Sequence, residues 1–542
     1  MNFLVILQRL VNKIDLEIDL LKWWFKLAPL RNIHAQQKEK TLLVCAMLSI
    51  TATAKAEALF SAVLRKRGFK LVVLLPYSSP ILERCFCSIG NVEFIYLNDF
   101  LNSEDIQNAN FSSERYLGVI GNFVELFNLN IDGVRTGQNV LSKSLRTLRV
   151  GTIDFSNTTH LELIRKNLSE SIQISIAIRK ILSQVRPDLA LFNERGYTPA
   201  GEIFDACLVN GIDVIQWLGS PLKNCLVYKR YNLENRDQHP LSISQKGWEF
   251  LLSHNSSKEM QNRIMVHLQE NYHAEGWYNH QQLNVGKKIR EKSDICLQLG
   301  LDPTKKTAVV FSHILYDATF FYGSSLFPDY LTWLLETVRL AISNSSINWI
   351  IKVHPVNVWR SRMDGAPMEQ LEVKAINEAF GQLPPHIKFI LADSDINTYS
   401  LFSFIDYGLT VRGTIGMELP CFGIPVITAG TGRYSGHGFT IEPTSIEEYG
   451  NILLNLQELA PLGSDEIRKA QLFAYGTLIL RGIPMDALQF AYNEKIIFSK
   501  ARKMNVNLSR EKALNLENSA DLGLFQDWVC NGDLDELFRE FV

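Results

Sequence analysis

The 542-residue sequence predicts an α/β protein with two successive domains, each built on a parallel β-sheet. Two observations lead to this fold class. Residues 41–75 follow a strand–helix–strand pattern, and a second series of alternating strands and helices begins near residue 300. A strand–helix–strand unit of this length joins neighbouring parallel strands. The chain is also too long for one ordinary hydrophobic core, which favours at least two domains.

The first α/β domain is expected over residues 41–231. Short apolar runs predict its strands, and the helical patterns between them predict crossovers. The expected strands are 41–48, 70–75, 92–96, 189–192 and 212–217. The expected helices are a segment ending near Gly68, 161–186 and about 199–210. Residues 101–160 fit no single pattern.

The second α/β domain is expected over residues 300–463. Its strands are 307–311, 349–353, 388–391, 407–411 and 425–428, with helices at 326–342 and 416–422. Residues 232–299 read as a helical connector or insertion, and 464–542 as a helical C-terminal segment whose last ~25 residues are loosely held. Two Rossmann-like domains that face one another would place a ligand cleft at the carboxyl ends of both sheets.

Residues 1–40 predict an amphipathic helical segment. Apolar residues at steps of three or four define one face: Phe3, Leu7, Leu10, Ile14, Ile18, Leu21 and Phe25. Pro29 should end the helix. This face packs on the body or on a partner, or it lies on a membrane, which Trp23, Trp24 and the lysines favour. The second alternative predicts weak peripheral contact with anionic vesicles through residues 1–30.

Composition excludes several classes of protein. With 55 basic and 57 acidic residues the formal net charge is −2, so a globally basic nucleic-acid binder is not expected. No apolar run approaches the ~18 residues of a membrane span. Charged residues interrupt the N-terminus, which argues against a signal peptide. The 8 cysteines show no zinc-ligand spacing and predict reduced thiols. A cytoplasmic protein is expected, or one at the inner face of the cytoplasmic membrane.

Two strand ends of the second domain carry candidate ligand-binding residues. The strand 307–311 leads into Ser312 and His313, and then to Asp317, which could instead be a helix N-cap. The strand 349–353 delivers Lys352 and His354 to the same edge of the sheet. An ammonium group and an imidazole there suit a phosphate group.

A third strand end carries a glycine-bracketed turn before a helix. The candidate residues from this turn and helix are Arg412, Gly413, Thr414, Gly416 and Glu418. The N–H groups of a helix start bind anions, and glycines allow a phosphate to approach the backbone. Glu418, one turn further, suits a pair of ribose hydroxyls.

The loop after the strand 425–428 is rich in glycine and supplies three further candidates. Arg433, Tyr434 and His437 could wrap a polar ligand, although an ordinary surface loop would show the same composition.

These motifs, in this order, resemble the donor domain of GT-B glycosyltransferases, and especially bacterial capsule and surface polysaccharide biosynthesis proteins. The matching motifs are Asp317-Ala318-Thr319, Lys352-Val353-His354-Pro355, Gly413 to Glu418, Gly423-Ile424-Pro425-Val426 and Tyr434 to Thr440. His354-Pro355 is similar to the His-Pro motif of sialyl- and Kdo-transferases, whose histidine contacts the donor phosphate. The resemblance implies that Thr414 holds phosphate and Glu418 holds ribose. Arg412 departs from the small polar residue that is frequent at that position.

The resemblance implies a glycosyltransferase that moves a sugar from a nucleotide-sugar donor to a capsule- or lipopolysaccharide-type acceptor, a glycan or a lipid-linked glycan. No Asp-x-Asp motif stands at a strand end, which fits metal-independent chemistry without a cofactor, the nucleotide-sugar being a substrate. The charge of the departing nucleotide would then be met by Lys352, His354, Arg412 and helix N–H groups.

A general base is expected from the first domain. Glu194 follows the strand 189–192 and is the first candidate, with Asp317 the next; a surface carboxylate paired with Arg195 is the alternative for Glu194. Two other functions remain open. A sugar-nucleotide 2-epimerase shares this two-domain fold, and a non-catalytic sugar-binding or scaffolding subunit could retain the same motifs.

Overall fold

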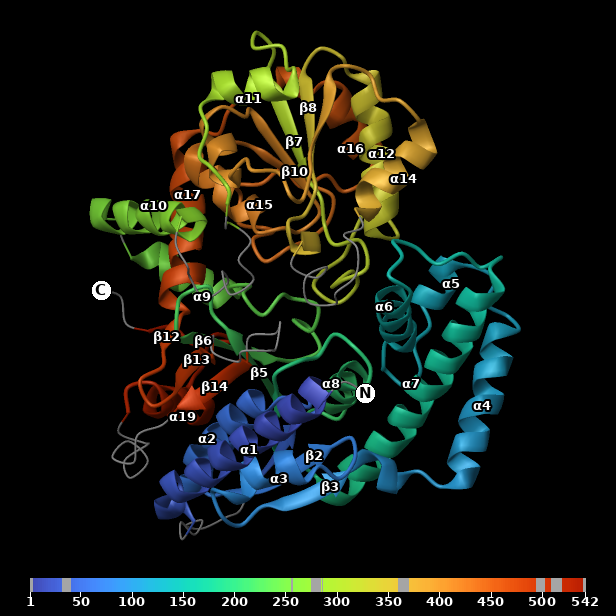
Figure 1. Ribbon diagram of the computed structural model, residues 1–542, viewed down its shortest axis with the longest axis vertical. Helices are drawn as coiled ribbons and strands as arrows, with labels where there is room; N and C mark the ends of the chain where they lie inside the picture. The colour runs from blue at the N-terminus through green and yellow to red at the C-terminus, as the bar shows by residue number, and fades with distance from the viewer. Residues whose placement is uncertain are drawn as a thin grey trace.

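The protein is described by a computed structural model over residues 3–31, 40–254, 257–273, 284, 286–358, 370–493, 503–507 and 519–539. Figure 1 shows two α/β lobes, each built around its own β-sheet, and confirms the predicted fold class. Among the residues described, no helix combines the length and apolar character needed to cross a membrane.

The first lobe contains a seven-stranded sheet in the order β12-β6-β5-β4-β1-β2-β3. Its strands are β1 (Lys40–Cys45), β2 (Phe69–Leu75), β3 (Glu93–Tyr96), β4 (Leu189–Phe192), β5 (Asp213–Gly219), β6 (Cys225–Tyr231) and β12 (Ile483–Pro484). The first five are parallel and match the predicted runs, whereas β6 runs antiparallel to β5 and was not predicted. The buried faces of β1, β2 and β4 explain their nearly continuous apolar sequence.

Helices cover both faces of this sheet. They are α2 (Thr51–Lys66), α3 (Pro80–Cys87), α4 (Ser103–Leu117), α5 (Phe123–Phe127), α6 (Thr136–Leu148), α7 (Thr158–Val185) and α8 (Ala200–Val209), with 3-10 turns η1 (Ala28–Leu30) and η2 (Leu97–Phe100). The segment that fitted no pattern forms α4 to α6, which pack with the long α7 beside the sheet (Figure 1). Asn102 and Asn157 cap α4 and α7 by accepting N–H bonds.

The second lobe holds a five-stranded parallel sheet in the order β11-β10-β7-β8-β9. The strands are β7 (Thr307–Phe311), β8 (Asn348–Lys352), β9 (Ile387–Ile390), β10 (Tyr407–Thr410) and β11 (Val426–Thr428). The surrounding helices are α11 (Lys292–Leu299), α12 (Tyr330–Ser343), α14 (Leu371–Phe380), η4 (Thr398–Ser403), α15 (Ile415–Glu418), η5 (Leu419–Phe422), α16 (Ile446–Leu454) and η6 (Leu456–Glu458). All five strands agree with the predicted runs to within a residue or so.

The connector and the C-terminal segment join the lobes. The connector forms α9 (Gln245–Ser253) and α10 (Lys258–His273), and the chain returns through α17 (Ser464–Ala474) and the π-helical turn η7 (Tyr475–Leu480). Side chains from these four elements form one apolar cluster with Met417, Tyr434 and Phe439 of the second lobe. In Figure 1, α10 and α17 lie on the same side of the molecule, next to both lobes.

The C-terminal segment was predicted to be helical, with a loosely held end. The structure differs from both parts of that prediction. The segment contains β12, the antiparallel pair β13 (Gln489–Asn493) and β14 (Lys503–Asn507), and α19 (Leu522–Asn531). Ile483 of β12 pairs with Leu226, which returns the chain to the first sheet. Phe525 and Trp528 of α19 are buried in the core that also holds α2. The expectation of a loose end is therefore wrong for residues 519–539, because their apolar side chains complete the core of the first lobe.

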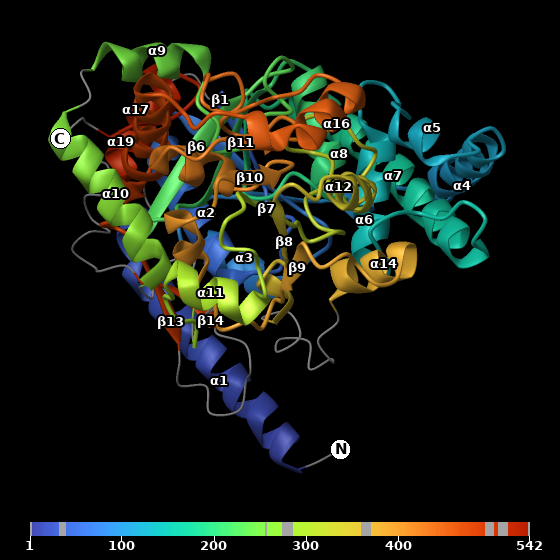
Figure 2. The same ribbon diagram turned by 90° about the horizontal axis from the view of Figure 1, so that it is seen from above.

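Helix α1 (Phe3–Lys26) lies against the first lobe with only part of its length. Leu20, Trp23 and Leu27 are buried there, and the indole N–H of Trp23 donates to the carbonyl of Cys85 at 3.1 Å. Figure 2 shows the N-terminal part of the helix extending away from the body. The members of the predicted apolar face whose side chains the structure describes lie on the other side of the helix and are exposed: Leu7, Leu10, Ile14, Ile18, Leu21 and Phe25.

Candidate functional site

A cavity of about 460 Å³ opens at the carboxyl ends of the second sheet. We call it the strand-end cavity. The predicted binding residues that line it are Ser312, His313, Lys352, His354, Gly413, Thr414, Glu418 and Arg433. They come from the loops after β7, β8, β10 and β11, which meet because parallel strands end at one edge of the sheet.

The ring of His354 has a defined orientation. Its Nδ1 accepts the backbone N–H of Val356 at 3.2 Å. A neutral imidazole in this state carries its proton on Nε2, which makes Nε2 a hydrogen-bond donor. Behind the turn, the amide of Asn357 donates to both carboxylate oxygens of Glu372, at 3.3 and 3.2 Å. Ser312 also lies beside Glu372, with its hydroxyl 3.4 Å from the carboxylate. Glu372, which the sequence did not indicate, therefore fixes the turn that carries His354.

Lys352 places a buried amine in the wall of the strand-end cavity. Only 5% of this residue is exposed. Burial, together with the positive charge of Lys287, lowers the pKa of the Lys352 amine to about 7. The amine therefore exchanges its proton near neutral pH, and a bound anion would stabilise its charged form.

His313 supports the site as a neutral ring. Its Nε2 accepts the backbone N–H groups of Val411 at 3.2 Å and Arg412 at 3.4 Å. The ring stacks on Tyr330, with the two centroids 4.3 Å apart. Burial, together with the charge of Arg412, holds the pKa of His313 well below its usual value. His313 thus fixes the beginning of the turn that follows β10.

The turn after β10 leads directly into α15. The N–H of Gly413 donates to the hydroxyl of Thr410 at 3.1 Å, and Thr414 precedes the first helical residue. The N–H groups of Gly416, Met417 and Glu418 donate to the carbonyls of Gly413 and Thr414, so this short turn is closed by its own hydrogen bonds. Gly416 and Tyr434 do not line the cavity. A Cβ on Gly416 would lie 2.1 Å from the Tyr434 ring, so these two residues instead shape the helix start from behind.

Glu418 shares the cavity with a residue from the connector. The hydroxyl of Tyr272, at the end of α10, donates to the Glu418 carboxylate. Burial raises the pKa of Glu418, and hydrogen bonds from Tyr272 and Thr414 oppose that shift. Sequence reasoning missed Tyr272 because α10 is nearly 150 positions from Glu418 and shows only an ordinary helical pattern.

Arg412 is placed differently from its neighbours. Its guanidinium donates to the carbonyls of Gly323 at 3.0 Å and Ser324 at 3.2 Å, and also to the hydroxyl of Ser325. It is not among the residues that line the strand-end cavity. Its positive charge nevertheless lies close enough to lower the pKa of His313. In this structure Arg412 holds the loop 323–325, which forms part of the next cavity.

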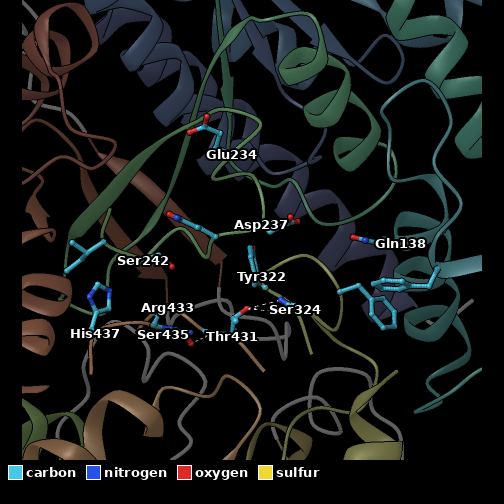
Figure 3. A pocket seen from close by; sticks show the side chains of 16 residues that line it. Gln138, Glu234, Asp237, Ser242, Tyr322, Ser324, Thr431, Arg433, Ser435 and His437 are labelled. Atoms are coloured by element: carbon cyan, nitrogen blue, oxygen red, sulfur yellow. Dashed lines mark hydrogen bonds between the residues drawn. The ribbon is translucent and has the colours of Figure 1, made fainter. Parts of the chain in front are cut away.

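A second cavity of about 470 Å³ adjoins the first, and we call it the interdomain cavity. Arg433 lines both. The first lobe contributes Gln138, the connector contributes Glu234, Asp237 and Ser242, and the loops of the second lobe contribute Tyr322, Ser324, Thr431, Ser435 and His437. In Figure 3, Ser324 and Thr431 lie together near Tyr322. The backbone N–H and the hydroxyl of Ser324 both form hydrogen bonds with the hydroxyl of Thr431.

His437 faces the interdomain cavity from an aromatic setting. Its ring lies 4.8 Å from that of Trp248 and 4.7 Å from that of Phe473. Burial lowers the pKa of His437 to about 4, so the ring is neutral at physiological pH. This residue can donate or accept a hydrogen bond but supplies no charge there.

The first-domain loop after β4 contacts the interdomain cavity through Arg195. Its guanidinium donates to Gln216 at 3.0 Å and to the backbone carbonyls of Arg236 and Gln238. Because Asp237 lies between those two residues, Arg195 fixes a segment of the cavity wall. The sequence indicated Arg195 only as a possible surface ion pair, whereas it is 2% exposed.

The two predicted catalytic carboxylates lie near this wall but not on it. Glu194 accepts the N–H groups of Arg195 at 2.8 Å and Gly196 at 3.0 Å. Burial and the nearby Glu194 carboxylate raise the pKa of Tyr322, which does line the cavity. Asp317 accepts a hydrogen bond from Tyr197 of the first lobe. The catalytic role of either carboxylate stays a prediction.

Within the described part of the chain, no group of three or more His, Cys, Asp or Glu residues is placed to hold a metal ion. Metal-independent chemistry stays a prediction.

Comparison with known proteins gives distant structural similarities. No family model and no curated protein sequence matches the chain. Among solved structures, it is similar to the β-Kdo 2,4-transferase KpsC of Thermosulfurimonas dismutans (14% identity, TM-score 0.31, 54% of this chain and 80% of that one). It is also similar to the UDP-GlcNAc 2-epimerase of Neisseria meningitidis bound to UDP-GlcNAc (12%, 0.26, 81% and 96%). A third is Anabaena HepE in complex with UDP-glucose (13%, 0.26, 80% and 93%). These similarities are too distant to assign a substrate or a reaction.

Proposed function

We propose that this protein is a metal-independent glycosyltransferase of the GT-B type, which uses a nucleotide-sugar donor in the assembly of a surface polysaccharide. One observation carries the proposal. His354, Lys352, Thr414 and Glu418 line a single cavity at the carboxyl ends of the second sheet, and Arg433 connects it to a cavity shared by both lobes. Two of the motifs that resemble GT-B donor domains, residues 352–355 and 413–418, contribute residues to this cavity.

The strand-end cavity is the proposed donor site. The Nε2–H of His354 and the Lys352 amine would bind the donor phosphate, together with the hydroxyl of Thr414, which lines the same cavity. The carboxylate of Glu418, held by Tyr272, would accept hydrogen bonds from ribose hydroxyls. These groups favour the negative charge that develops on the departing nucleotide, and they are already in place before the reaction begins.

The interdomain cavity is the proposed acceptor site. It lies next to the donor site, and Arg433 at their junction would face the bond that breaks. Its polar side chains, including Gln138, Asp237 and Ser242, suit the hydroxyl groups of a glycan. Glu194 is the proposed base for the attacking hydroxyl, and its carboxylate lies close enough to Tyr322, which lines the cavity, to raise the pKa of that residue.

Product analysis tests the reaction class. The full chain is incubated with CMP-, UDP-, GDP- and dTDP-linked sugars labelled in the sugar, with and without a panel of methyl glycosides as acceptors. A transferase forms a labelled glycoside only when an acceptor is present. A labelled C2 epimer formed without acceptor would instead identify an epimerase, and binding of a donor without any product would identify a sugar-binding protein.

A further inference from the structure

Helix α1 has two apolar faces on opposite sides. Leu16, Leu20, Trp23 and Leu27 pack on the first lobe. About half a turn around the helix, a second row of apolar side chains points to solvent. This row consists of Leu7, Val11, Ile14, Ile18, Leu21 and Phe25, whose exposed fractions run from 44% to 70%. We call it the exposed stripe. A helix held by one face while a long apolar row faces water has an unpartnered surface.

The spacing of the exposed stripe is that of a coiled coil. Its members alternate steps of four and three residues through the whole row. This is a heptad repeat with Val11, Ile18 and Phe25 at the a positions and Leu7, Ile14 and Leu21 at the d positions. The residues that pack on the first lobe occupy c and f positions. They therefore lie away from the seam, the row of a and d residues that would contact a second helix. Two of the three a positions, Val11 and Ile18, are β-branched and two of the three d positions are leucine, a combination that favours parallel two-stranded pairing.

We propose that the exposed stripe pairs with the same stripe of a second copy of this chain, as a parallel two-stranded coiled coil. This inference goes beyond the proposed function and does not depend on it. An isologous contact of this kind closes into a dimer and does not extend into a filament.

The attachment of α1 to its own lobe permits this pairing. Because the lobe contacts the c and f side, a two-fold axis along the exposed stripe would place the two bodies on opposite outer sides of the helix pair. Figure 2 shows that the N-terminal part of α1 extends beyond the body, so Leu7 and Val11 are accessible to a second helix. The helix is already formed and fixed by Trp23, so pairing does not have to order it.

Charges beside the exposed stripe favour a second copy over a lipid surface. Glu17, at a g position, and Lys22, at the following e position, flank the seam on opposite sides. In a parallel pair, Glu17 of one chain lies next to Lys22 of the other. Glu17 also contacts Arg84 of its own chain at 2.7 Å, which orients it.

The charges around the exposed stripe are less suited to an anionic membrane. The carboxylates of Asp15 and Glu17 border the exposed stripe on both sides, where they would approach lipid phosphates. Interfacial helices usually carry a polar face rich in Lys and Arg opposite the apolar one. Here the opposite face is apolar and buried on the first lobe.

Sedimentation equilibrium of the full chain at micromolar concentration tests the proposal. The expected mass is about twice 61.7 kDa. The double variant Ile14→Glu/Ile18→Glu puts charges into the seam and should raise the dimer dissociation constant at least ~100-fold, because unpaired buried charges are strongly unfavourable. Lys13→Glu, exposed on the same helix but outside the seam, should remain a dimer. Circular dichroism confirms that each variant is folded, which is expected because the altered side chains are exposed.

Cross-linking tests the register. Leu7→Cys should form a disulfide-linked dimer on mild oxidation, because the same d residue of two parallel helices meets across the axis. Lys13→Cys should not. A wild-type chain that stays monomeric would overturn the proposal, and so would a dimer that survives the double substitution. Co-sedimentation of a monomeric wild type with vesicles of phosphatidylcholine and phosphatidylglycerol, lost in the double variant, would assign the exposed stripe to a membrane instead.

Discussion

The hydroxyl of Tyr197, from the first lobe, donates a hydrogen bond to the carboxylate of Asp317, from the second. The backbone N–H of Ala318 donates to the same hydroxyl at 3.0 Å, and the Arg146 guanidinium lies 4.5 Å above the Tyr197 ring. Burial, with Asp317 next to it, raises the pKa of Tyr197, so the hydroxyl keeps its proton. These contacts join the two lobes beside the interdomain cavity.

The proposed base is tested by Glu194→Gln. Glutamine keeps an oxygen that can accept the N–H groups of Arg195 and Gly196, so the turn should be retained, but it cannot take up a proton. We expect turnover to fall by ~10²–10⁴ with donor affinity and melting temperature unchanged. Asp317→Ala and Tyr197→Phe serve as the comparison, because both remove the hydrogen bond between the lobes and should therefore have similar, smaller effects. Near-normal turnover in Glu194→Gln, or a much larger loss in Asp317→Ala than in Tyr197→Phe, would move the role to Asp317.

The buried amine of Lys352 predicts a proton uptake on donor binding. Its pKa of about 7 in the ligand-free protein should rise when a phosphate group binds, because the anion stabilises the charged amine. Calorimetry at pH 8 in buffers of different ionisation enthalpy should show close to one proton taken up. In Lys352→Met the uptake should disappear and affinity should fall, whereas Lys388→Met, outside the cavity, should leave both unchanged. Identical binding enthalpies in all buffers would refute this role.

The same amine affects stability. In the unfolded chain its pKa is about 10.4, so between pH 7 and 10 the unfolded chain binds more protons and the stability contributed by this group rises with pH. Lys352→Met should therefore raise the melting temperature of the ligand-free protein more at pH 7 than at pH 10.

The close contact between Gly416 and Tyr434 predicts a steric effect. A Cβ at position 416 would lie 2.1 Å from the buried ring, so Gly416→Ala should lower the free energy of unfolding by roughly 1–3 kcal/mol and disturb the helix start. Gly450→Ala is the matched control. Gly450 lies within α16 and its Cβ would meet Leu340 at 3.8 Å, an ordinary distance, so this change should stabilise by about 0.5–1 kcal/mol. Thermal or denaturant unfolding of the two variants compares them directly, and equal stabilities would contradict the packing described here.

The sequence was most informative where structure is local. The parallel strands of both sheets appear as short apolar runs, and strand-end residues such as Lys352, His354 and Thr414 meet in one cavity because the topology requires it. Elements defined by distant partners could not be predicted in this way. β12 is two residues long and exists through its pairing with β6, and α19 is stabilised by burial against α2.

Residue roles were harder to predict than positions. His313, Arg412 and Tyr434 were all expected to bind substrate, yet His313 accepts backbone N–H bonds and Arg412 holds a loop. Tyr434 is buried under Gly416. Whether a charged or aromatic side chain faces a ligand or supports the cavity wall depends on residues that are close in space but distant in sequence. Tyr272 and Glu372 illustrate the converse, since nothing in their sequence surroundings distinguishes them from other helical residues.

The central claim is that the strand-end cavity binds the phosphate of a nucleotide-sugar. The most direct measurement is the thermal stability of the full chain with CMP-, UDP-, GDP- and dTDP-linked sugars, followed by calorimetry of the nucleotide that binds. At a hundred times its dissociation constant, that nucleotide should stabilise the protein by ~2.7 kcal/mol. His354→Ala should weaken binding by about 1.5–3 kcal/mol, while His386→Ala, whose ring contacts the carbonyl of Ala341 away from the cavity, should not. Stabilisation by none of these donors, or equal affinity in wild type and His354→Ala, would contradict the account.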